Sequence, residues 1–164
     1  MPKETRGKDS GAEGFRVGFS ELNDMRFFRT AQNDPDLLEK LRTFLADTGD
    51  DWNYILPTEL EKRLGDDKLF LLDVREPEDF AEGHIPGSEN IFWLDLLDEK
   101  NLEKLPTDKT IVVICYVGHT ASQALTLLKL LGYKAVGLKF GMGISPVEGV
   151  PVAGWTDYGF EIEK

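Results

Sequence analysis

From Trp52 onward, short apolar runs alternate with segments of helical periodicity. The clearest run, 110–114, is β-branched and apolar, which is typical of a strand buried on both faces. Residues 119–131 follow with apolar side chains at spacings of three and four, and Gly132 ends this predicted helix. Weaker patterns predict further strands at 54–56, 69–74, 91–92 and 135–138, and further helices at 57–64, 77–82 and 94–105.

Strands separated by helices in this order indicate an α/β fold. Right-handed crossovers make successive strands parallel and place helices on both faces of the sheet. The sequence contains no internal repeat. The pattern therefore predicts one mostly parallel sheet flanked by helices in residues 52–164.

The N-terminal third of the chain has a different character. Residues 1–14 are charged and glycine-rich, which predicts a flexible tail, and residues 15–51 predict an extension with one helix at about 35–47. Asp34 is placed to cap this helix and Pro35 to occupy its first position. The apolar stripe of the helix could pack on the α/β domain or mediate self-association, and the sequence favours neither.

The charge balance narrows the possible partners. The 164 residues include 19 basic and 30 acidic ones, which gives a net charge of −11. An acidic surface repels phosphate backbones, so the charge balance argues against sequence-independent nucleic-acid binding. The longest apolar stretch, 111–117, is far shorter than the roughly 20 residues that cross a bilayer, and no secretion signal is present. We therefore expect no nucleic-acid or membrane partner. We expect a cytoplasmic location, with an exported protein whose leader has been removed as the alternative.

The single cysteine, Cys115, lies between the clearest strand and the clearest helix. Ligands of open α/β sheets bind at this end of the strands, and the free N–H groups of a helix N-terminus favour an anion there. A thiol in such a place is favoured as the nucleophilic thiolate. Gly118 allows the backbone to turn toward the sulfur, and Thr120 can add a hydroxyl donor. Alternatively, Cys115 is a small buried apolar residue at the end of a core strand.

Three ordered segments resemble one known family. Residues 115–122, CYVGHTAS, are similar to the active-site loop of rhodanese-type sulfurtransferases. Residues 71–80, LLDVREPEDF, and 82–91, EGHIPGSENI, resemble the DVR and GHIPGA-N signature of that family. Residues 132–143 are similar to the segment that follows the catalytic helix. Together the matches cover about residues 54–143, which is more specific than a single loop motif.

The resemblance implies a central parallel sheet of about five strands and a persulfide mechanism. Cys115 would accept sulfane sulfur from a donor such as thiosulfate or a persulfide. Cyanide in an assay, or a thiol or protein cysteine in the cell, would then remove it. The resemblance implies no cofactor and no metal. The substrate-binding residues that it implies are Tyr116, Val117, Gly118, His119, Thr120 and Ala121.

Two departures from the family pattern bear on the substrate. The loop lacks the basic side chains of thiosulfate-specialised members, apart from a protonated His119, so thiosulfate is expected to be a mediocre donor. The family's Gly-Gly pair and C-terminal helix ending in Trp are replaced by residues 141–146, and Trp155 comes later. This leaves the C-terminal cap and one wall of the pocket undefined.

Other functions would use the same residues. A metal site or a Cys–His hydrolase pair would join Cys115 to His119 or His84, but two ligands without an orienting motif are weak support for either. His84 lies in a GHIPG segment that predicts a turn fixing the next strand. Phosphatase chemistry needs arginine where Ala121 stands. The alternative from another class is a non-catalytic rhodanese-fold interaction module, with residues 1–51 as its partner surface.

A few further residues have open roles. Asp73 and Arg75, near the end of a predicted strand, either form a structural ion-pair network or tune the field at the cysteine. Lys139 is either a pocket cation or an ordinary surface residue. Residues 141–143 imitate a dinucleotide fingerprint, but Pro146 occupies the third glycine position. One cysteine also excludes an internal disulfide and a multi-cysteine metal site.

Overall fold

The computed structural model describes residues 34–144, 147 and 149–164. The predicted tail and the part of the predicted extension before Asp34 lie outside these residues. Residues 39–164 form one compact unit. Every helix within the described ranges is too short or too polar to cross a membrane.

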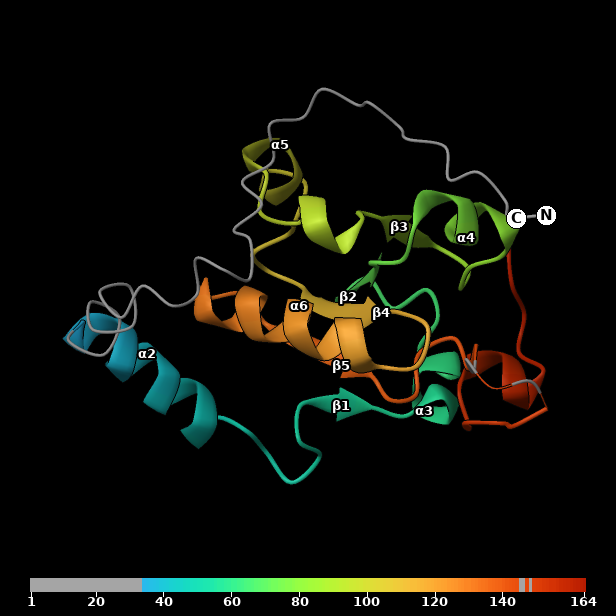
Figure 1. The fold of residues 1–164 in the computed structure, drawn as a ribbon, viewed down its shortest axis with the longest axis horizontal. Coiled ribbons are helices and arrows are strands. Elements are labelled where there is room, and N and C mark those ends of the chain that lie inside the picture. Colours follow the sequence, from blue (N-terminus) through green and yellow to red (C-terminus); the bar gives the residue numbers. More distant parts are fainter. Residues whose placement is uncertain (1–33, 145–146, 148) are drawn as a thin grey trace, which may run out of the picture. The chain divides into compact units, whose positions relative to one another are not determined.

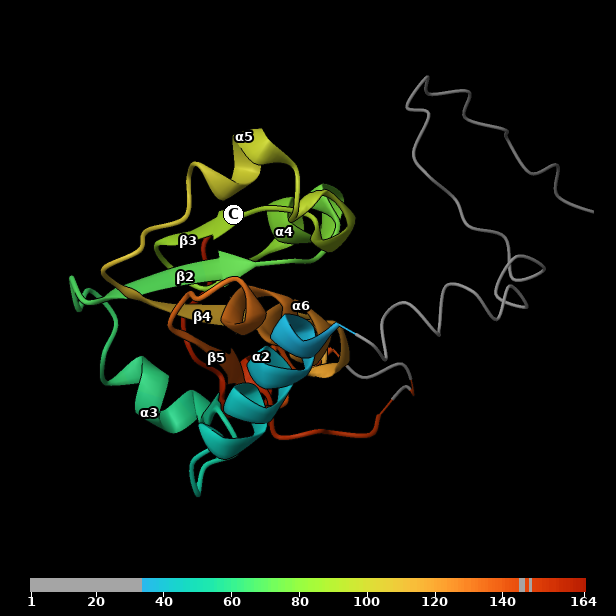
Figure 2. The same cartoon turned by 90° about the vertical axis from the view of Figure 1, so that its left-hand side faces the viewer.

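Within these residues, five strands form one parallel sheet in the order β1-β5-β4-β2-β3 (Figure 1). Figure 2 shows β3, β2, β4 and β5 lying side by side in this order. This confirms the predicted α/β class with its mostly parallel sheet. The strands are β1 Tyr54–Ile55, β2 Leu69–Asp73, β3 Ser88–Asn90, β4 Thr110–Ile114 and β5 Ala135–Leu138.

The centre of the sheet positions the cysteine. β4 has neighbours on both sides, and all but its first residue are buried, which agrees with its continuous apolar sequence. Its last residue, Ile114, pairs with Asp73, the last residue of β2. Because the two strands are parallel and in register, they end at the same edge of the sheet, and Cys115 follows at that edge.

Helices cover both faces of the sheet. One core contains Val113, Cys115 and the buried face of helix α6, and the other contains Val112, Ile114 and Leu60 of helix α3. Alternate residues of β4 therefore enter opposite cores, as expected for a strand with a period of two. The α-helices are α2 Pro35–Ala46, α3 Pro57–Glu61, α4 Pro77–Glu82, α5 Glu99–Leu102 and α6 His119–Leu130, and the 3-10 helices are η2 Trp93–Asp95 and η3 Trp155–Tyr158.

The two twelve-residue helices, α2 and α6, end within one residue of their predicted bounds. The Leu37 N–H donates to the Asp34 carboxylate over 3.0 Å, so Asp34 caps α2 as expected. Helix α6 ends at Leu130, and Gly132 follows with a φ of 94°, the left-handed conformation predicted for this position.

Two sequence predictions were wrong. The strand predicted at 91–92 is displaced to β3, because this edge strand is polar and gives a weak hydrophobic signal, while Ile91 adds one ladder hydrogen bond to Asp73 O. The single helix predicted at 94–105 consists of η2 and α5 instead. Its leucines do not share one buried face, since Leu96 and Leu105 are buried whereas Leu94 and Leu97 are exposed.

The C-terminal segment supplies the cap that the sequence left undefined. Trp155 begins η3 and is fully buried in the same core as α3. Its indole N–H donates to Glu161 O over 2.8 Å, which satisfies the one polar group of the side chain. The displaced tryptophan therefore closes one face of the domain.

Candidate functional site

Cys115 lies between the end of β4 and the start of α6, and only 1% of its surface is exposed. It belongs to the core that α6 covers. Burial alone matches the apolar alternative raised by the sequence. Whether the buried thiol can also act as a nucleophile depends on the polar groups around the sulfur.

The turn before α6 directs an amide at the sulfur. Gly118 has a φ of 101°, a conformation that residues with a Cβ rarely adopt, and its N–H donates to Cys115 Sγ over 3.1 Å. The N–H groups of His119, Thr120 and Ala121, in the first turn of α6, have no partner among the described residues. The start of α6 can therefore stabilise negative charge beside the thiol.

A second loop holds the cysteine backbone from the other side. The Met142 N–H donates to Cys115 O over 2.8 Å, and the Gly143 and Ile144 N–H groups donate to Tyr116 O over 3.0 and 3.2 Å. Gly141 allows this approach, since a Cβ there would overlap Cys115 O. The segment predicted only as a family match thus fixes the backbone on which the thiol is mounted.

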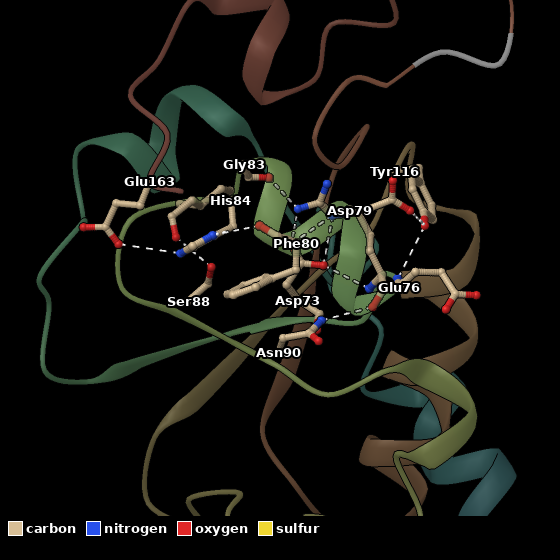
Figure 3. Close-up of polar contacts among 12 residues, drawn as sticks. Asp73, Glu76, Asp79, Phe80, Gly83, His84, Ser88, Asn90, Tyr116 and Glu163 are labelled. Carbon is tan, nitrogen blue, oxygen red and sulfur yellow. Dashed lines mark hydrogen bonds and ion pairs between the residues drawn. The ribbon is translucent and has the colours of Figure 1, made fainter. Parts of the chain in front are cut away.

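Tyr116 joins the loop after β4 to helix α4. Its hydroxyl donates to Asp79 and accepts a long hydrogen bond of 3.4 Å from the Glu76 N–H (Figure 3). Burial, and next the hydrogen bond with Asp79, raise the pKa of Tyr116 to about 12. The hydroxyl therefore keeps its proton at neutral pH and remains a donor.

Asp73 and Arg75 form a buried ion pair, one of the two roles considered for them. The Arg75 guanidinium binds both Asp73 carboxylate oxygens, with the shortest contact at 2.7 Å, and also donates to Gly83 O over 2.8 Å. Asn90 donates to the main-chain oxygens of both residues over 3.0 Å. The Arg75 guanidinium carbon lies 5.9 Å from the centre of the Tyr116 ring. The ion pair thus lies beside the Tyr116 side chain of the loop after β4.

The remaining predicted site residues differ in their exposure to solvent. Val117 and Thr120 are partly buried, His119 is exposed, and Ala121 is fully buried. Their roles in substrate binding stay predictions. Lys139 is exposed, with its ammonium 5.6 Å from the Phe140 ring.

Sequence reasoning missed the partners of Tyr116. Asp79 and Glu76 lie about 40 positions earlier in the chain, and no local pattern pairs them with Tyr116. The available signal was an acidic residue in the first turn of a helix that starts directly after the strand ending at Asp73. Asn90 was also missed as the residue that bridges the ends of β2 and β3.

His84 has the surroundings of a turn residue. Its ring nitrogen Nδ1 lies 3.0 Å from Phe80 O, and its ring stacks on that of Phe80 with centres 3.8 Å apart. Its backbone forms an isolated antiparallel bridge with Glu163. In the part of the chain that the structure describes, no group of three or more His, Cys, Asp or Glu side chains could hold a metal ion.

Residues 56–141 match the rhodanese-like domain family. The chain belongs to this family. The match confirms the resemblance drawn from the three segments, and it covers β2 to β5 together with α3 to α6. The structural neighbours agree: the rhodanese-like domain superposes on a rhodanese-related protein from Thermoplasma volcanium with a TM-score of 0.56 and 26% identity, covering 68% of this chain and 97% of that one.

Sequence relatives of the rhodanese-like domain include proteins of different lengths. YtwF of Bacillus subtilis is 38% identical over 82 residues, which cover 50% of this chain and 78% of YtwF. The thiosulfate sulfurtransferase GlpE of Pseudomonas syringae is 33% identical over 84 residues, which cover 49% of this chain and 74% of GlpE. MoeZ of Mycobacterium tuberculosis is longer, and the match covers 23% of it.

Proposed function

We propose that this protein is a sulfurtransferase in which Cys115 carries sulfane sulfur as a persulfide. Membership in the rhodanese-like family and similarity to a thiosulfate sulfurtransferase support the general reaction class. The observation that carries the proposal is the hydrogen bond from the Gly118 N–H to Cys115 Sγ.

In the first half-reaction the Cys115 thiolate attacks the outer sulfur of a donor. With thiosulfate, the new bond joins Sγ to that sulfur, the sulfur–sulfur bond of the donor breaks, and sulfite leaves with the bonding electron pair. Amide donors at the start of α6 are suited to stabilise the thiolate before the step and the terminal persulfide anion after it. No separate oxidant or reductant is consumed.

In the second half-reaction an acceptor attacks the terminal sulfur. Cyanide leaves as thiocyanate, and a thiolate leaves as a new persulfide, while the bonding pair returns to Cys115 Sγ as thiolate. We propose a small sulfane donor and a thiol acceptor, which can be a protein cysteine. In this proposal the donor approaches the sulfur past four residues of the loop and of the first turn of α6: Val117, His119, Thr120 and Ala121. Because the loop carries no Lys or Arg side chain, a less charged donor should react faster than thiosulfate.

Mass spectrometry tests the persulfide directly. Treatment with thiosulfate, or with inorganic polysulfide, should add one sulfur atom to Cys115, and cyanide should remove it with release of thiocyanate. Cys115→Ser is the matched control, because it replaces only the sulfur atom and leaves no thiol in these 164 residues. Absence of the adduct with every sulfane donor would overturn the proposal.

The burial of Cys115 favours one other function, a rhodanese-fold interaction module without turnover. The two functions differ in the reactivity of the thiol. Alkylation by iodoacetamide near pH 6 should be fast for a sulfur held as thiolate and slow for a sulfur buried as an apolar group. Slow alkylation together with no persulfide would favour the module.

A further inference from the structure

Tyr116 is held at both ends of its length. Its main-chain oxygen accepts the Gly143 and Ile144 N–H groups, and its hydroxyl donates to Asp79 of α4. The side-chain contact joins residues 37 positions apart and connects the loop after β4 to the helix after β2. The residue directly after the cysteine is therefore tied to two different parts of the domain.

Helix α4, whose Asp79 accepts the hydrogen bond from the Tyr116 hydroxyl, is fixed by the buried Asp73–Arg75 ion pair. Arg75 precedes α4 by two residues and is fixed by Asp73 and by Gly83 O, at the opposite end of that helix. Figure 3 shows Asp79 on α4 directed at the Tyr116 hydroxyl, with Glu76 beneath it. Because Arg75 fixes this helix, the Asp79 carboxylate that accepts the hydrogen bond from Tyr116 has a defined position.

The geometry at the sulfur depends on the short segment between these fixed parts. Cys115 directly follows β4 and α6 begins at His119, so Tyr116 and Val117 are the two residues that connect the cysteine to the turn at Gly118. Gly118 has no Cβ to restrict its backbone, and the N–H to Sγ distance of 3.1 Å depends on its orientation. A tether on Tyr116 removes freedom from the first residue of this segment.

We propose that Tyr116 is a positioning residue. Its hydrogen bond to Asp79 holds the loop so that the Gly118 amide faces Cys115 Sγ. This inference rests on the proposed function of Cys115, because it assigns a role in the formation of the persulfide there.

The test measures single-turnover persulfide formation, by quenching and mass spectrometry, over a range of donor concentrations. Tyr116→Phe and Asp79→Ala each remove the hydrogen bond and should slow the maximal rate about tenfold, the equivalent of about 1.4 kcal/mol. If Tyr116 acts by positioning and not by binding the donor, the donor concentration at half-maximal rate should change less than about twofold. Asp79→Asn should restore most of the rate, because its amide oxygen still accepts from the hydroxyl.

Two comparisons separate positioning from general stability. Tyr133→Phe is the matched control. It removes a tyrosine hydroxyl that lies outside the loop and donates a 3.4 Å hydrogen bond to Leu102 O, so the rate of this variant should equal that of the wild type. The double variant Tyr116→Phe/Asp79→Ala should be no slower than either single variant, because both remove the same contact.

Each other outcome has a defined meaning. A wild-type protein that forms no persulfide overturns the proposed function itself. A wild-type protein that forms it, with Tyr116→Phe at the same rate, overturns the positioning role alone. An Asp79→Asn rate as low as that of Asp79→Ala also overturns it, because the carboxylate charge would then matter instead of the hydrogen bond. If Asp79→Ala does not fold, the Tyr116→Phe and Asp79→Asn pair still decides.

Discussion

At the scale of single residues, the Tyr116 hydroxyl holds its proton more strongly than an ordinary tyrosine does. It donates to Asp79 in a partly buried position, and an ionised phenol there would face a carboxylate. The raised pKa, about 12, follows from this environment. The consequence is a phenol that keeps its proton, and so remains a donor, until strongly alkaline conditions.

This gives a pH dependence of stability. Between pH 10 and about 12 the unfolded chain releases the Tyr116 proton while the folded protein retains it, so the free energy of unfolding falls as pH rises. The stabilisation is complete below pH 10 and is lost above the folded pKa. The difference between wild type and Tyr116→Phe in urea unfolding should be constant from pH 7 to pH 10 and shrink above pH 10. A difference that grows at alkaline pH contradicts the assignment.

At the scale of elements, the Asp73–Arg75 pair joins the end of β2 to helix α4. Both side chains are essentially fully buried, and Arg75 reaches Gly83 O at the end of the helix. A buried pair of this kind adds little net stability compared with apolar residues, but loss of one partner leaves an uncompensated charge. Its role is to fix the direction in which α4 leaves the sheet.

Arg75→Met should therefore be strongly destabilising. It leaves the Asp73 carboxylate buried without its partner, and we expect a loss of about 3–5 kcal/mol in the free energy of unfolding. Urea unfolding at pH 7 measures it. Arg63→Met is the matched control, since the Arg63–Asp66 pair lies largely at the surface and its loss should destabilise the protein far less. Equal losses in the two variants would contradict this role.

The elements also show what the sequence could predict. β4 and α6 were predicted well because their signals are strong: a β-branched apolar run, and an apolar stripe that ends at glycine. β3 was misplaced because an edge strand with polar residues resembles a loop. The predicted 94–105 helix failed because its leucine spacing reflects two short turns that bury different side chains.

The same distinction applies to the site. Cys115 and Gly118 stand out locally, as a strand end followed by a turn and a helix. The Tyr116–Asp79 contact does not, because it depends on β2 and β4 ending at one edge of the sheet. Asp73 and Arg75 were located correctly near that edge, but only the coordinates distinguish an ion pair from a group facing the thiol.

At the scale of the whole molecule, residues beyond the family match complete the fold. The match ends at 141, yet Trp155 fills the core on the α3 face and Glu163 bridges to His84. Segments from the two ends of the domain are thus packed together. Loss of the C-terminal packing should weaken the domain as a whole.

Trp155→Ala should remove about 3–5 kcal/mol from the free energy of unfolding, because it empties a fully buried indole site. Chemical unfolding followed by circular dichroism measures the loss. Trp52→Ala is the matched control, since that side chain is 73% exposed and should change stability by about 0.5 kcal/mol or less. A Trp155→Ala protein as stable as the control would mean that the C-terminal segment does not belong to the cooperative unit.

The solitary, nearly inaccessible Cys115 has a consequence for turnover. These 164 residues contain no resolving thiol, so a sulfur atom loaded onto Cys115 cannot be passed to a neighbour within the same stretch or discharged by closing a ring between two cysteines. If Cys115 carries sulfur as proposed, discharge requires an acceptor outside these 164 residues that reaches the edge where the strands end. The lifetime of the loaded form is then set by how often that acceptor reaches this edge.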